Sequence, residues 1–139
     1  MKIAVSACLL GHNCKYNGGN NLSQKVLDYT EDHEVIPVCP EVAGGMSTPR
    51  VPVELKGDKA INRDGEDVTE FFRKGVKKTM EKMQDIDLAI LQPRSPSCGC
   101  KQIYDGSFTK TLIDGKGMFA QALAEAGIPL MDGDDVPEK

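Results

Sequence analysis

The chain has 139 residues, 40% of them hydrophobic and 27% charged, which is typical of one globular domain with no room for a second large core. The balance of 17 basic and 21 acidic residues gives a net charge of -4, unlike the basic surface of a protein that binds duplex nucleic acid. There is no apolar run of about 18 residues to span a membrane, and the apolar run at the N-terminus is too short for a secretory signal. We therefore expect a cytoplasmic protein with a single domain over residues 1–139.

Three apolar segments predict buried β-strands, at residues 2–9, 34–39 and 87–92, and a shorter strand is expected at 128–131. Pro37 lies inside the second segment. It favours an edge position for that strand, because proline cannot donate to a sheet ladder. Glycines and prolines interrupt residues 40–53, which are expected to form a loop, and only short strands are expected at 51–62.

Helical patterns separate these strands. Ser23 is a candidate N-cap of a short helix, and Asp67 with Glu70 resembles a capping box before an amphipathic helix that reaches Met83. A further helix is expected at 118–126, with Gly127 ending it. Alternating strands and helices predict an α/β fold with three layers (α/β/α), a mostly parallel sheet and a site at the C-terminal strand ends. The acidic tail from about residue 132 is expected to be frayed.

The cysteines carry the strongest functional signal. There are five: Cys8, Cys14, Cys39, Cys98 and Cys100. An odd number in a chain without a secretory signal argues against a disulfide framework. Cys8 ends the first predicted strand, Cys39 ends the second, and Cys98 follows the third. Because parallel strands end at one edge of a sheet, these three thiols are expected to share a site there.

The spacing leaves the nature of that site open. A zinc ion with Cys14 or Cys100 as the fourth ligand is one alternative, although the chain has no C-x2-C pair. An iron–sulfur cluster, which tolerates wide spacing, is another. A third is a thiol redox enzyme in which Cys98 and Cys100 form a C-x-C pair.

Polar residues close to these thiols could act on a substrate. Glu41 follows Cys39 by two positions and could be a general base for water, and Ser97 could place a hydroxyl beside Cys98. Arg50 and Arg94 could hold an anionic or carbonyl group. The alternative interpretation is a solvated loop acid, a turn-forming serine and two surface ion pairs.

Five segments, in the same order along the chain, resemble the DUF523 family. They are VSACLLGHNCKYNGG (5–19), VIPVCPEVAGGMSTPR (35–50), DGEDVT (64–69), RSPSCG (94–99) and QIYDGSF (102–108). The likeness covers nearly the whole chain except the acidic tail. The family includes thiouracil desulfidases, so the resemblance implies an enzyme with a [4Fe-4S] cluster that replaces the sulfur of a thiocarbonyl by oxygen from water, without net redox change.

The resemblance also implies roles for particular residues. Cys8, Cys39 and Cys98 would hold the cluster, with Cys14 as a less favoured alternative. Glu41 and Ser97 would be the catalytic pair, with Glu41 accepting a proton from the attacking water.

The partner implied by the resemblance is a small thiolated base such as a thiouracil. One departure concerns the family motif C-R-Y-D-G, which is Cys14-Lys15-Tyr16-Asn17-Gly18 here. Aromatic stacking on a pyrimidine would have to use Tyr16, Tyr104, Phe108 or apolar side chains. A zinc- or cluster-binding module or sulfur carrier without catalysis remains the alternative function.

Overall fold

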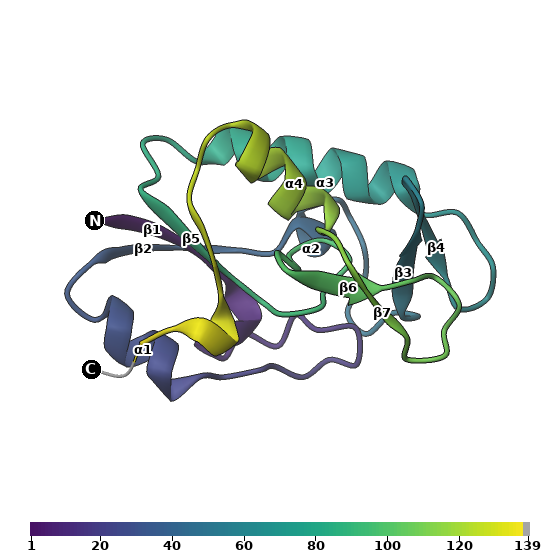
Figure 1. Cartoon of the computed structure of the whole chain (residues 1–139), viewed down its shortest axis with the longest axis horizontal. Helices are drawn as coiled ribbons and strands as arrows, with labels where there is room; N and C mark the ends of the chain where they lie inside the picture. Colours follow the sequence, from purple (N-terminus) through teal and green to yellow (C-terminus); the bar gives the residue numbers. More distant parts are fainter. Residues whose placement is uncertain (138–139) are drawn as a thin grey trace.

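The computed structural model describes residues 1–137, in which strands and helices alternate along the chain (Figure 1). The strands are β1 (Lys2–Ser6), β2 (Glu34–Val38), β3 (Val53–Lys56), β4 (Lys59–Asn62), β5 (Leu88–Leu91), β6 (Gln102–Tyr104), β7 (Leu112–Asp114) and β8 (Leu130–Asp132). The α-helices are α1 (Gln24–Thr30), α2 (Pro40–Ala43), α3 (Thr69–Lys82) and α4 (Met118–Glu125). Two short 3-10 helices, η1 (Ala7–Leu10) and η2 (Gly133–Asp135), follow β1 and β8.

The central sheet has four strands in the order β2-β1-β5-β8, and every pair in it is parallel. β2 lies at one edge, so the edge position predicted from Pro37 is confirmed. The chain passes from β1 to β2 on one side of β1 and then crosses to β5 on its other side. The strand order therefore reverses between β1 and β5, and such a switch point opens a crevice at the carboxyl ends of the strands.

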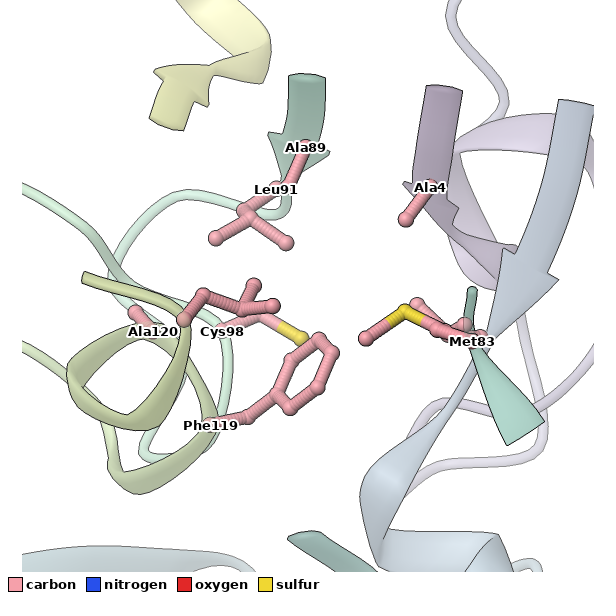
Figure 2. Packing of buried hydrophobic residues seen from close by; sticks show 9 residues of the cluster. Ala4, Met83, Ala89, Leu91, Cys98, Phe119 and Ala120 are labelled. Carbon is pink, nitrogen blue, oxygen red and sulfur yellow. The ribbon is translucent and has the colours of Figure 1, made fainter. Parts of the chain in front are cut away.

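Both faces of the sheet are covered. Alternate residues of β1 and β5 point to opposite faces: Ile3 and Ile90 pack with Val26 of α1, whereas Ala4 and Leu91 pack on the α4 side. Figure 2 shows the second cluster, in which Phe119, Leu91 and Met83 meet below the sheet. Burial on both faces explains the continuous apolar runs of these strands. The predicted three-layer α/β architecture is confirmed.

Outside the sheet, β3–β4 and β6–β7 form two antiparallel hairpins. The short strands expected at 51–62 are the first of these. A third buried cluster, which includes Leu55, Ile103 and Phe72, joins both hairpins to α3. The hairpins stand beside the carboxyl ends of β1 and β5 and extend the wall of the crevice.

Three local expectations are corrected. The expected loop at 40–53 begins with α2, because Pro40 occupies the first helical turn, where a missing N–H costs nothing. Asp67 accepts from Thr69 N, but Glu70 pairs with Arg73 instead of completing a capping box.

The acidic tail, expected to be frayed from about residue 132, is ordered to Val136, which is buried in the cluster around α1. Only residues 138–139 lie outside the described part. None of the described helices is long and apolar enough to cross a membrane.

Candidate active site

Three predicted thiols come together at the switch point. Cys8 lies in η1 directly after β1, Cys39 is the N-cap of α2 directly after β2, and Cys98 lies in the loop after β5. All three line one cavity of about 490 Å³. Cys98 also belongs to the core, where its side chain lies beside Phe119 (Figure 2). The parallel sheet thus delivers thiols from three distant segments to one place.

The surroundings of the thiols differ. Cys8 Sγ lies 3.7 Å from Gln92 Oε1 and 4.0 Å from Asn21 Nδ2. The Cys14 thiol beside Cys8 and Cys39 lowers the pKa of Cys8 and, together with burial, raises the pKa of Cys39. Burial raises the pKa of Cys98 to about 12.

The donor set fits an iron–sulfur cluster held by three thiolates. Soft thiolate ligands on well-separated loops around a cavity are what such a cluster requires. Within residues 1–137, no group of three or more His, Cys, Asp or Glu side chains is close enough to hold a single metal ion. The zinc alternative therefore has no support. Cys100 is not among the residues that line the cavity and packs against the core cluster instead.

Glu41 and Ser97 are in direct contact. Glu41 is the second residue of α2, and Ser97, which is 2% exposed, precedes Cys98. Ser97 Oγ lies 2.9 Å from Glu41 Oε2 and 3.8 Å from Cys98 Sγ. The structure therefore brings both candidate catalytic side chains together on the wall of the cavity that the thiols line.

Arg50 holds the other side of the Glu41 carboxylate. Its Nε donates to Glu41 Oε1 at 3.2 Å, and the side chains are only 6% and 14% exposed. The same guanidinium donates to the carbonyl oxygens of Cys14 and Ser47. This rigid set of donors fixes the carboxylate in one orientation. The interpretation of Glu41 as a solvated loop acid is therefore wrong.

Arg94, the other candidate arginine, also lines the cavity, but its side chain is half exposed and lies 3.7 Å from Asp134. The exposed Arg94–Asp134 ion pair contributes little to stability.

Ser95, which the sequence motifs do not single out as a site residue, orients the hydroxyl group of Ser97. Its Oγ accepts from Ser97 N at 3.2 Å and Cys98 N at 3.0 Å, and lies 3.1 Å from Ser97 Oγ. Two backbone donors use both lone pairs of the Ser95 hydroxyl, so its proton is free to bond to Ser97 Oγ. The proton of Ser97 is then directed to Glu41, which as a carboxylate can only accept.

The position of Glu41 depends on two glycines. The backbones of α2 and α3 touch: a Cβ at Gly75 would lie 1.8 Å from the Pro40 carbonyl oxygen, and one at Gly44 would lie 2.0 Å from that of Phe71. Only glycine permits this approach. It places α2, and with it Glu41, over the strand ends.

Comparisons with known proteins identify the family of this chain. A family model described as 2-thiouracil desulfurase matches residues 3–135. The uncharacterized protein YbbK of Bacillus subtilis (strain 168) is 39% identical over 137 residues, covering 90% of this chain and 91% of that protein. The solved structure of a [4Fe-4S]-dependent thiouracil desulfidase, TudS, matches with a TM-score of 0.91 and 36% identity, over 98% of this chain and 93% of that chain.

These matches cover almost all of the described residues, and they confirm the resemblance that the sequence motifs indicate. The chain therefore belongs to the 2-thiouracil desulfurase family, a family of enzymes.

Proposed function

We propose that this enzyme is a [4Fe-4S]-dependent, non-redox desulfidase that acts on a thiolated pyrimidine. In the reaction, the C=S bond of the substrate is replaced by C=O, the oxygen comes from water, and sulfur leaves as sulfide. One thiocarbonyl and one water give one carbonyl and one hydrogen sulfide, so no oxidant or reductant is needed. The name of TudS supports this reaction class, and so does the chemistry of the cavity.

Cys8, Cys39 and Cys98 would hold the cluster through their sulfur atoms. When bound by three thiolates, a [4Fe-4S] cluster supplies an iron that is a Lewis acid with affinity for sulfur. The strand ends hold the three side chains, and Gln92 and Asn21 contribute amides beside Cys8. Cys14, the less favoured alternative ligand, contacts both Cys8 and Cys39.

Glu41 would act as the proton acceptor for the attacking water. Its carboxylate is held by Arg50 on Oε1 and by Ser97 on Oε2, so it need not reorganise during the reaction. A proton taken up by Glu41 can return to the departing sulfur through Ser97 Oγ, which lies between the carboxylate and Cys98 Sγ.

One observation carries the proposal: the Ser97–Glu41 hydrogen bond lies in the wall of the same cavity as the three thiols. A site for binding or storage alone would have no use for an oriented carboxylate and hydroxyl there.

The test is turnover of 2-thiouracil by the anaerobically purified protein in water enriched in oxygen-18. We expect one sulfide and one oxygen-18-labelled uracil per substrate consumed, without added reductant or oxidant. Uracil without the label, or a requirement for an oxidant, would exclude the hydrolytic reaction. A protein that retains iron and sulfide but turns over no thiolated base would instead be the binding module or sulfur carrier.

A further inference from the structure

The aromatic residues of the chain are distributed unevenly. Of the 4 phenylalanines and 3 tyrosines, three line the cavity: Tyr16, Tyr104 and Phe108. The others are Phe72 and Phe119, which are in the core, Tyr29, which contacts His33, and Phe71, which is exposed on α3. Flat apolar surface is therefore concentrated around the thiols and Glu41.

Phe108 has an unusual backbone. It lies in the loop between β6 and β7 with a φ of 58°, and Lys110 in the same loop has a φ of 61°. A bulky residue in the left-handed region is uncommon, and such conformations persist where the surroundings enforce them. The left-handed conformation of Phe108 costs conformational free energy, which a glycine at this position would avoid.

Glu54 of β3 enforces this conformation. Its Oε1 accepts from Gly106 N at 3.0 Å and from Phe108 N at 3.1 Å. Gly106 lies so close to β3 that a Cβ there would be 3.0 Å from the Leu55 carbonyl oxygen. Hydroxyl contacts between Ser107, Thr109 and Thr111 brace the rest of the loop.

We propose that Phe108, positioned by Glu54, stacks on the flat ring of the substrate and so selects aromatic thiocarbonyl compounds over thioamides without a ring. This inference rests on the proposed function and assigns the part of the cavity that recognises the ring. Phe108 lines the cavity and remains partly exposed, as a stacking surface must. Stacking of a base on an aromatic side chain tolerates different substituents because every base has a π face.

Kinetics with two substrates test the selection. Phe108→Ala is expected to raise KM for 2-thiouracil about tenfold with kcat within about twofold, a loss typical of one base–aromatic stack. The KM for thioacetamide, which has no ring, is expected to stay unchanged. Phe71→Ala, which removes an exposed phenylalanine away from the cavity, is the matched control. Equal effects on both substrates, or on neither, would overturn the proposal.

A binding measurement separates this inference from the proposed function. The chain has no tryptophan, so Phe108→Trp introduces a single tryptophan, whose emission can be excited apart from that of the 3 tyrosines. Titration with uracil is expected to quench its emission saturably, whereas Phe71→Trp is expected to be unaffected. This readout does not depend on turnover. Quenching in a protein that releases no sulfide would support the stacking site and contradict the desulfidase. Sulfide release without quenching in Phe108→Trp would support the desulfidase and overturn the stacking site.

Glu54 has a conservative variant. Glu54→Gln keeps the Oε1 acceptor and is expected to retain the wild-type KM, whereas Glu54→Ala is expected to raise it as Phe108→Ala does. Trypsin cleavage after Lys110 provides an independent readout, because the loop that Glu54 anchors contains this site. Faster cleavage at Lys110 in Glu54→Ala but not in Glu54→Gln is expected. Identical cleavage and KM in both variants would show that Glu54 does not position the loop.

Discussion

Ser97 donates its hydroxyl proton to Glu41 Oε2 over 2.9 Å, although the two residues are 56 positions apart in the sequence. The contact joins the start of α2, which follows β2, to the loop after β5. It lies against Cys98 on one side and Arg50 on the other. A proton acceptor and a hydroxyl are thereby held at the edge of the sheet where the thiols gather.

Substitutions at Glu41 and Ser97 test the role of this pair in the reaction. Glu41→Gln and Ser97→Ala are each expected to reduce sulfide release from 2-thiouracil by at least about 100-fold, the lower end of what a general acid or base contributes. Iron and acid-labile sulfide content should remain at the wild-type level. Glu81→Gln, on the exposed face of α3, serves as the charge-matched control. Loss of iron in either variant would mean that the residue supports the structure of the site rather than the reaction.

Arg50 is expected to matter for stability as well as activity. Arg50→Ala leaves the Glu41 carboxylate without its main cation in a mostly buried setting, which costs about 3 kcal/mol in the free energy of unfolding. Denaturant unfolding measures this loss. Arg73→Ala removes an exposed pair with Glu70 and should cost less than about 1 kcal/mol. Equal losses in the two variants would contradict the structural role of Arg50.

Ser95→Ala should reveal the role of the hydroxyl that orders the loop. The variant leaves the amides of Ser97 and Cys98 without their hydrogen-bond acceptor and frees the Ser97 side chain to rotate. We expect a stability loss of about 1 kcal/mol, as for a lost helix cap, together with a clear loss of kcat.

Two variants control for Ser95. Ser95→Thr keeps the hydroxyl and should restore activity. Ser23→Ala removes the cap of α1, none of whose residues lines the cavity, and should cost stability alone. An unchanged kcat in Ser95→Ala would exclude a positioning role.

Much of this architecture follows from the sequence. The apolar runs predict the parallel strands, and the ends of those strands alone predict that Cys8, Cys39 and Cys98 share one edge of the sheet. Pro37 indicates the edge strand correctly. These signals are local, because burial on both faces and the missing N–H of proline act within a single strand.

The parts that the sequence does not predict depend on long-range contacts. Glu54 meets a loop 52 or more residues away, and nothing near it in the sequence indicates its partner. Helix α2 is not predicted, because the proline and glycines in this segment are typical of loops. Ser95 is the exception, because a serine hydroxyl often bonds to the backbone two residues later in the chain, as it does here with Ser97 N.

The contact between α2 and α3 predicts the sign of the change in the free energy of unfolding on Gly75→Ala. Helix propensity alone would favour Gly75→Ala by about 1 kcal/mol. The added Cβ would meet the Pro40 carbonyl oxygen, however, and backbone must move to accommodate it. We expect a net destabilisation of about 2 kcal/mol and reduced activity, because α2 carries Glu41. Lys74→Ala on the exposed face of α3 is the control, and a Gly75→Ala variant as stable as the wild type would contradict the close packing.

The cluster and its three ligands can be tested together by iron and acid-labile sulfide analysis of protein purified without oxygen, with Cys8→Ser, Cys39→Ser, Cys98→Ser and Cys100→Ser variants alongside. We expect about four irons and four sulfides per wild-type chain, as a [4Fe-4S] cluster requires. Both should be lost in the first three variants and retained in Cys100→Ser. One zinc and no sulfide, or a cluster that survives loss of any one of Cys8, Cys39 and Cys98, would exclude a [4Fe-4S] cluster held by these three thiolates.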